Sequence, residues 1–364
     1  MFLALREFKH AKLRYILIGS IMVLISFLVL FVSGLAKGLS YDNSSLIQNM
    51  KTDYLILEEN SGRQMNHSFL TEAKFLEIQQ LYKIGDATPI GIQMTTLMEK
   101  GSNKKVDATF LAINVDNRLS PKVVEGKMIT NITTNEVVAD KSLKDEGYKI
   151  GDRIKDQISG KEFNIIGFTE GQSYSHTPVI HLNFKEWKSI HQTKSNSKIY
   201  NAIAVNTTKK EIQAVKNVSG IDVISKKQAL QGIPGYKEEQ GSLLMMIVFL
   251  FVIGAIVLAV FYYVMTIQKI NQFGVLKAIG SKTSYLAKNI IAQVLYLTFA
   301  SLVISITLTY VLSFMLPSSL PFVISIQLIV GCSVLFLLVA VIGSLLSLYR
   351  VAKIDAIEAI GRAF

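Results

Sequence analysis

Cysteine, tryptophan and proline are scarce in this chain of 364 residues, which has one cysteine, one tryptophan and six prolines. The single cysteine, Cys332, lies in an apolar run and excludes both an intramolecular disulfide and a cysteine-rich metal site. Any folded domain must therefore be stabilised by its own apolar core. A stretch of about 200 residues is long enough to bury one.

Charged side chains are absent from the core of each of the four long apolar runs. This absence argues against proton relays and ion pathways, which place ionisable groups inside membrane helices. An ATP site is also absent. The sequence AIGSKT resembles a phosphate loop, but such a loop needs adjacent glycine and lysine, and Ser281 separates Gly280 from Lys282. The chain has no nucleophile elbow, convincing metal-ligand cluster or evident pair of catalytic carboxylates, so the sequence does not predict an enzyme.

Apolar residues make up 50% of the chain and charged residues only 18%, with a mean hydropathy of +0.37. This composition predicts a membrane protein. The net charge of +11 would also suit a nucleic-acid-binding protein, but residues 41–241 carry 26 lysines and arginines against 24 acidic residues. The excess cations flank the apolar runs instead. We interpret them as a membrane-topology signal and predict no nucleic-acid partner.

Each apolar run is long enough to cross a bilayer as a helix. Cations at both ends of the chain and between the second and third runs place these regions in the cytoplasm by the positive-inside rule. A cleaved signal peptide is the alternative for the first run, although three more spans follow it. The predicted segments are a cytoplasmic amphipathic segment at 1–14, spans at 15–36, 243–267, 289–316 and 325–348, an extracytoplasmic domain at 41–241, a cytoplasmic coupling segment at 268–288, an outer loop at 317–324 and a cytoplasmic tail at 349–364.

The region between the first two spans alternates apolar and polar residues in short segments, which indicates strands. The spacing from Ser68 to Ile84 is instead helical, with Ser68 as the expected N-cap. The region is therefore predicted to be an α+β domain. The strands are expected at 53–59, 108–115, 135–140, 162–168, 178–184 and 201–206.

One span, a large outer domain and three further spans form an unusual plan, and two stretches carry a family pattern. These are EVVADKSLKDEGYKIGDRIKDQISGKEFNIIGFT at 136–169 and INQFGVLKAIGSKTSYL at 270–286. Together they resemble the MacB/FtsX-type permeases of ATP-binding-cassette (ABC) systems. Within that family, the stretch RYILIGSIMVLISFLVLFVSGLAKGLSYDNSSLI at 14–47, the compact outer domain, FGVLKAIGS at 273–281 and Gln293 are most similar to the DevC/HrtB branch. Two positions depart from the family pattern: Gln272 replaces a usual glutamate, and Gln293 replaces an acidic residue common early in the third span. These departures put a salt-bridged form of docking in doubt.

The resemblance implies a MacB-like, type VII ABC exporter fold and a homodimer in the plasma membrane, typically of a Gram-positive bacterium. It also implies two copies of a separate ATP-binding subunit, which bind the ATP, and no intrinsic cofactor. The amphipathic helix after the second span would dock on that subunit, and spacing places Leu276 and Ile279 on one face with Phe273 one turn earlier. A helix lying on the membrane surface is the alternative. The predicted coupling residues are Phe273, Leu276, Lys277, Ala278, Ile279 and Gly280.

The DevC/HrtB branch implies export of an amphiphile, with haem the first candidate and an antimicrobial peptide or a lipid the alternative. An FtsX-like permease that signals to a cell-wall hydrolase and transports nothing is the alternative from another class. Haem iron is bound by His, Tyr, Met or Cys. Tyr174 and His176 would share a face if their segment is extended, and three methionines lie near the outer ends of the first two spans. Ordinary packing or surface exposure is the competing interpretation for all five candidates, which are Tyr174, His176, Met50, Met245 and Met246.

Overall fold

The computed structural model describes residues 12–82, 87–99, 104–191, 199–317 and 320–352. The chain divides into two compact units. The helical unit contains residues 1–37, 242–317 and 322–364, and the sheet unit contains residues 38–241 and 318–321. Residues 1–11, 83–86, 100–103, 192–198, 318–319 and 353–364 lie outside the described residues.

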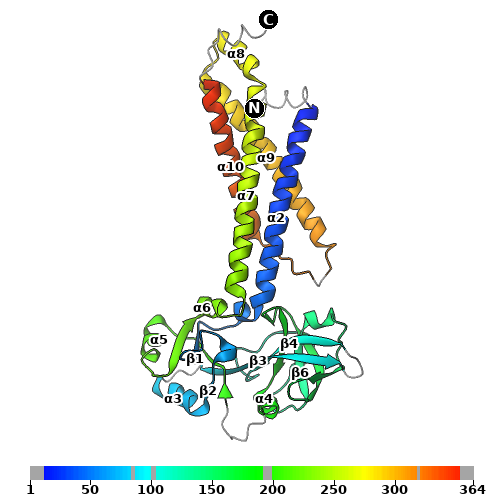
Figure 1. Ribbon diagram of the computed structural model, residues 1–364, viewed down its shortest axis with the longest axis vertical. Helices are drawn as coiled ribbons and strands as arrows, with labels where there is room; N and C mark the ends of the chain where they lie inside the picture. The colour runs from blue at the N-terminus through cyan, green and yellow to red at the C-terminus, as the bar shows by residue number, and fades with distance from the viewer. Residues whose placement is uncertain (1–11, 83–86, 100–103, 192–198, 318–319, 353–364) are drawn as a thin grey trace. The chain divides into compact units, whose positions relative to one another are not determined.

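Within the described residues, four helices are long and apolar enough to cross a membrane, and a short fifth helix, α8, follows the second of them (Figure 1). Leucine, isoleucine, valine and phenylalanine fill the long helices, so apolar side chains face outward all round, as a lipid environment requires. The five helices are α2 (Lys12–Asn49), α7 (Tyr236–Ile267), α8 (Ile270–Ala278), α9 (Thr283–Ser313) and α10 (Ile326–Ala352).

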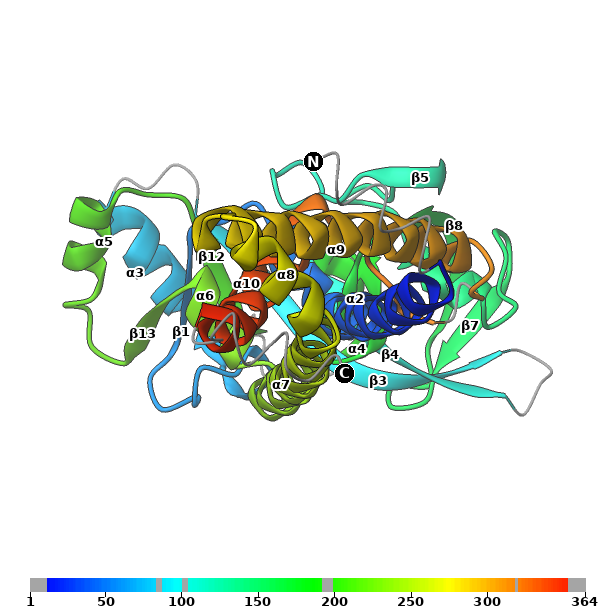
Figure 2. The same cartoon turned by 90° about the horizontal axis from the view of Figure 1, so that it is seen from above.

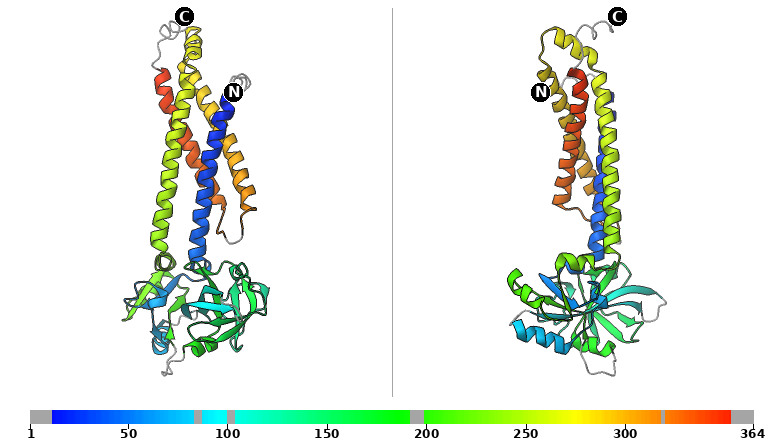
Figure 3. Two further views of the ribbon diagram at one scale, coloured as in Figure 1. Left: turned by 45° about the vertical axis from the view of Figure 1, so that its right-hand side comes forward. Right: turned by 60° about the vertical axis from the view of Figure 1, so that its left-hand side comes forward.

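Small hydroxyl side chains join the long helices within the helical unit. Ser26 of α2 lies 2.5 Å from Ser305 of α9, oxygen to oxygen, and Tyr262 of α7 lies 2.9 Å from Thr298 of α9. Such pairs satisfy polar groups between membrane helices while the backbones approach closely. The α9 and α10 helices pack along each other, which is visible in both views of Figure 3.

The sheet unit is built on one large mixed sheet with the strand order β13-β1-β12-β3-β4-β10-β6-β8-β5. Its apolar side chains form clusters on both faces, and α3 and α5 lie next to each other beside the β13–β1–β12 end (Figure 2). The strands are β1 (Tyr54–Glu58), β2 (Leu70–Thr71), β3 (Thr88–Glu99), β4 (Lys105–Ala112), β5 (Val123–Gly126), β6 (Glu136–Asp140), β7 (Arg153–Asp156), β8 (Glu162–Thr169), β9 (Ser173–Tyr174), β10 (Thr177–Leu182), β11 (Ile199–Tyr200), β12 (Ala202–Val205) and β13 (Ile221–Ser225). The helices of this unit are α3 (Glu72–Tyr82), α4 (Phe184–Ile190), α5 (Lys209–Val215) and α6 (Lys226–Gln231).

The structure confirms the predicted fold class, because membrane-length helices flank an α+β domain inserted between the first and second of them. The expected start of the helix at 68–84 is wrong. Ser68 is no N-cap; its hydroxyl accepts a hydrogen bond from the Glu58 backbone at 2.8 Å. Leu70 and Thr71 form β2 with β11 instead, and the helix begins only at Glu72. A tertiary strand pairing here overrides the local helical pattern.

Helix α2 does not end with the predicted span at residue 36 but continues without a break to Asn49, inside the sheet unit. Gly34 on this helix allows a close contact, because a Cβ there would lie 2.7 Å from the ring of Phe322. The Val323 amide donates to the Gly34 carbonyl at 3.1 Å. The chain that leads into α10 is therefore packed against α2.

Candidate functional site

The predicted coupling segment forms helix α8 and ends in a Schellman motif. Gly280 has a positive φ of 96°, its amide donates to Lys277 at 2.9 Å, and the Ser281 amide donates to Leu276 at 2.9 Å. A residue with a Cβ is strained at that φ, so Gly280 ends the helix and turns the chain toward α9. Its role in the structure is to shape the segment.

Leu276 and Ile279, which are predicted to share one face of the helix, lie in different surroundings. Leu276 is half-buried against the apolar cluster of the membrane helices, whereas Ile279 is 77% exposed. The exposed apolar neighbour of Ile279 is Val275, one turn earlier and 51% exposed. Lys277 is half-buried and Ala278 is exposed, and the side chain of Phe273 lies outside the described residues.

A buried lysine lies directly before α8. The Nζ atom of Lys269 donates to the Gln293 amide oxygen at 2.7 Å and to the Tyr15 hydroxyl at 2.9 Å, and the side chain also lies over the Tyr15 ring. Lys269 is only 7% exposed. A buried charge is tolerated only with such polar partners, so these three residues tie the ends of α2, α7 and α9 together.

Tyr174 and His176 would share a face only in an extended segment, and the structure does not meet this condition. Ser175 and His176 have positive φ angles of 52° and 61°, so they form the tight turn of the β9–β10 hairpin. Tyr174 points into the core and is 1% exposed, and burial raises the pKa of its phenol. His176 remains exposed at the turn. The chain reverses direction at Ser175 and His176. The alternation of side chains along an extended strand therefore does not hold for Tyr174 and His176.

His176 connects three segments of the sheet unit. Its Nδ1 atom lies 2.8 Å from the Asp42 carboxylate near the end of α2, and its Nε2 atom lies 3.1 Å from the Glu239 carboxylate at the start of α7. The Asn43 amide also donates to Glu239. Partial burial lowers the pKa of His176, but the hydrogen bond with Asp42 and the charge of Glu239 outweigh it and raise the pKa above its ordinary value.

The three methionine candidates lie in different surroundings. Met50, just after α2, is 7% exposed and borders a cavity in the sheet unit. Met245 and Met246 lie on the first part of α7 in the helical unit and are 58% and 41% exposed. Among the described residues, no three His, Cys, Asp or Glu side chains are grouped so that they could hold a metal ion.

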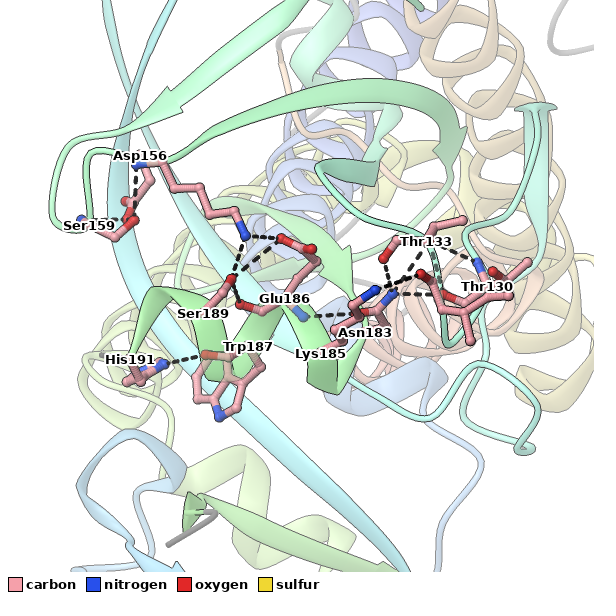
Figure 4. A network of polar contacts seen from close by, with 12 residues as sticks. Thr130, Thr133, Asp156, Ser159, Asn183, Lys185, Glu186, Trp187, Ser189 and His191 are labelled. Atoms are coloured by element: carbon pink, nitrogen blue, oxygen red, sulfur yellow. Dashed lines mark hydrogen bonds and ion pairs between the residues drawn. The ribbon is translucent and has the colours of Figure 1, made fainter. Parts of the chain in front are cut away.

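A second polar network surrounds α4 and is structural (Figure 4). The Asn183 side chain caps the helix by accepting from the Glu186 amide at 2.9 Å, and it donates to the Thr130 carbonyl at 2.7 Å. The buried Glu186 carboxylate accepts from Lys161, whose Nζ atom also reaches Ser189. Because each charge is matched by a partner, this network stabilises the fold and resembles no catalytic arrangement.

Known proteins that are similar to this chain include relatives that align with almost all of it. The model of the FtsX-like permease C-terminal family matches residues 244–356. Two relatives named as hemin transport system permease proteins HrtB, from Staphylococcus haemolyticus (strain JCSC1435) and Staphylococcus epidermidis (strain ATCC 12228), are 35% and 32% identical over 361 residues. The alignments cover 99% of this chain and 99% of each relative. The chain belongs to the FtsX-like permease family, in its HrtB branch.

A crystal structure of the periplasmic region of MacB from Actinobacillus actinomycetemcomitans is also similar, with 15% identity, a TM-score of 0.37, and coverage of 51% of this chain and 94% of that one. The predicted family is thus confirmed by the full-length relatives. As an FtsX-like permease, the chain is a membrane permease of the ABC-transporter type.

Sequence reasoning missed three residues of this FtsX-like permease: Lys269, Gln293 and Val275. The cations between the second and third spans indicate topology and Gln293 departs from the family pattern, but neither observation predicts the hydrogen bond between Lys269 and Gln293. A lysine directly after a span and a glutamine early in the next span were the available signal. Val275 was also left out of the coupling set, although its spacing of four from Ile279 already placed both on one face of a helix.

Proposed function

We propose that this permease is the membrane subunit of an ATP-driven exporter that takes haem from the membrane and expels it. The observation that supports this most is the 35% identity with a hemin transport permease over 99% of both chains. We further propose that two copies form a homodimer with two ATP-binding subunits, that both termini are cytoplasmic, and that the sheet unit is extracytoplasmic. The uncharged cores of the spans favour mechanical transmission over a polar tunnel.

In this proposal α8 contacts the ATP-binding subunit, and Ile279 is its main apolar contact. Ile279 and Val275 form an exposed apolar pair at the end of a helix that also carries Lys277. An amphipathic helix of this kind fits a groove on a soluble partner. Burying the Ile279 side chain there would contribute about 2 kcal/mol, which is roughly a 30-fold effect on affinity.

Haem export is tested in cells that lack their own haem exporter. Cells that express the permease with its ATP-binding subunit are expected to grow at haemin concentrations that arrest cells with the ATP-binding subunit alone, and to contain less haem. Equal haemin sensitivity, with both subunits present in the membrane, would refute haem export. Protection against a peptide antibiotic in the same cells would then point to the peptide instead.

The coupling role of α8 is tested with Ile279→Asp. We expect the variant to insert into the membrane normally, to bind the ATP-binding subunit at least about 30-fold more weakly, and to lose haemin protection, because an aspartate cannot enter an apolar groove without a large cost. Ile132→Asp is the matched control, since Ile132 is 80% exposed in the sheet unit. Equal binding and protection for the two variants would remove α8 from the interface.

A further inference from the structure

The sheet unit contains a cavity of about 450 Å³ that opens to solvent beside the end of α2. This volume lies within the range of small-molecule sites in proteins, about 300–1,000 Å³. One wall is the last part of α2, the same helix that contains the first membrane span. Another wall is the C-terminal end of β4 together with the segment that follows it. The apolar residues lining the cavity include Leu46, Met50, Leu111, Ile113 and Leu119.

Cations outnumber carboxylates in this lining, which also contains the neutral polar residues Tyr41, Asn49, Ser120 and Gln172. Three cations border the cavity: Lys51, Arg118 and Lys122. Among the described residues that line the cavity, Glu170 is the only carboxylate, and it is already paired with Lys141. Lys51 and Lys122 are exposed and form no ion pair with any residue that the structure describes. The cavity therefore presents an apolar floor and a rim of cations without enough carboxylates to balance it.

We propose that this cavity binds an amphiphile that carries a carboxylate, with its apolar body against the floor and its carboxylate at Lys51 and Lys122. The apolar surface favours the apolar body of such a molecule, and the cations favour its carboxylate. A neutral lipid would lack the contact with the cations, and a hydrophilic anion would lack the contact with the apolar surface. The inference rests on the proposed function, because it assigns a place in the sheet unit to a substrate of the exported class. It also gives Met50 a role, as part of the apolar floor.

The test uses mesoporphyrin IX, a metal-free amphiphile with two carboxylates, and the full-length chain in lipid nanodiscs. Val124 lines the cavity and is 50% exposed, so Val124→Cys places a reactive thiol at its edge, whereas the native Cys332 is buried. We expect saturating mesoporphyrin to slow maleimide labelling of this thiol at least about tenfold. Labelling of Ile132→Cys, an exposed position outside the cavity, is expected to stay unchanged.

The charge requirement is tested in the Val124→Cys background. Lys51→Gln with Lys122→Gln is expected to raise the half-protecting mesoporphyrin concentration about tenfold, because two partly exposed ion pairs contribute about 0.7 kcal/mol each. Lys149→Gln with Lys155→Gln removes the same charge from exposed positions outside the cavity and is expected to change nothing. The dimethyl ester of mesoporphyrin is expected to protect weakly and equally in all three proteins.

Two outcomes overturn the proposal: labelling of Val124→Cys that mesoporphyrin does not slow, or protection that is the same with and without Lys51 and Lys122. The single tryptophan, Trp187, lies in the same unit and reports whether each variant is folded. The proposed function fails separately. If mesoporphyrin binds as expected but the complete transporter does not protect cells from haemin, the cavity assignment stands and haem export falls. If protection is normal and the cavity variants bind equally, the cavity assignment falls alone.

Discussion

The buried histidine of strand β10 gives the sharpest prediction about stability. His181 is 1% exposed, lies between Leu111 of β4 and Val138 of β6, and neither ring nitrogen has a hydrogen-bond partner among the described residues. Burial lowers its pKa from 6.5 to about 3. The folded sheet unit therefore binds this proton much more weakly than the unfolded chain does.

The sign and size of the effect follow from proton linkage. A lowered folded-state pKa means that stability is fully present above pH 6.5 and is lost as the pH falls toward 3. Below pH 6.5 the fall in the free energy of unfolding approaches about 1.4 kcal/mol per pH unit, and it amounts to about 2.3 kcal/mol between pH 6.5 and 4.5. For a unit of this size the loss corresponds to about 5–10 °C in the unfolding midpoint.

The assay compares the wild type with His181→Leu, which removes the titrating group and the two unsatisfied nitrogens. Thermal unfolding is followed by the fluorescence of Trp187, which is buried in the same unit. When the pH is lowered from 6.5 to 4.5, the unfolding midpoint of the wild type is expected to fall by about 5–10 °C more than that of the variant. His67→Gln, at an exposed histidine, is the control and is expected to follow the wild type. Parallel curves for wild type and His181→Leu would refute the reasoning.

Two further predictions concern the polar contacts at the helix ends. The raised pKa of His176 means that its stabilising contribution is present below pH 6.5 and is lost as the pH rises through the folded-state pKa. We therefore expect hairpin residues 173–177 to lose hydrogen-exchange protection from pH 6 to pH 8 in the wild type but not in His176→Gln. Equal pH dependence in the two proteins would contradict this. Gln293→Leu is expected to destabilise the helical unit by about 2 kcal/mol, and Gln293→Leu with Lys269→Met by less, because the single change leaves a buried charge without one acceptor. Labelling of the buried Cys332 during heating reports this unit, and a larger loss in the double variant would exclude the assignment.

The membrane helices and six of the thirteen described strands could be predicted because each depends on a local pattern. Charge-free apolar runs identify the spans, and alternation identified counterparts of β1, β4, β6, β8, β10 and β12. The 12-residue strand β3 was missed although it is central to the sheet and pairs with β4 and β12. Polar and apolar residues are mixed along β3 because its two ends pair with different strands. A search for local alternation therefore does not identify this strand.

The candidate site was predictable as a segment but not as a surface. The sequence located α8 and its apolar residues, yet only packing shows that Leu276 belongs to the bundle and Ile279 to solvent. The spacing of two between Tyr174 and His176 places both side chains on one face only if the chain is extended there. The chain is not extended, because Ser175 and His176 form a two-residue turn with positive φ angles.

The sequence by itself determined the number of membrane-length segments, the inserted α+β domain and the family, because hydrophobicity and local patterns act over short distances along the chain. Only the tertiary structure decided which polar groups meet: Lys269 with Gln293, and His176 with Asp42 and Glu239. It also formed the cavity lined by Met50, Lys51 and Lys122, and isolated His181 from hydrogen-bond partners among the described residues. These features depend on distances between residues far apart in sequence, and those distances are fixed only when the apolar cores close.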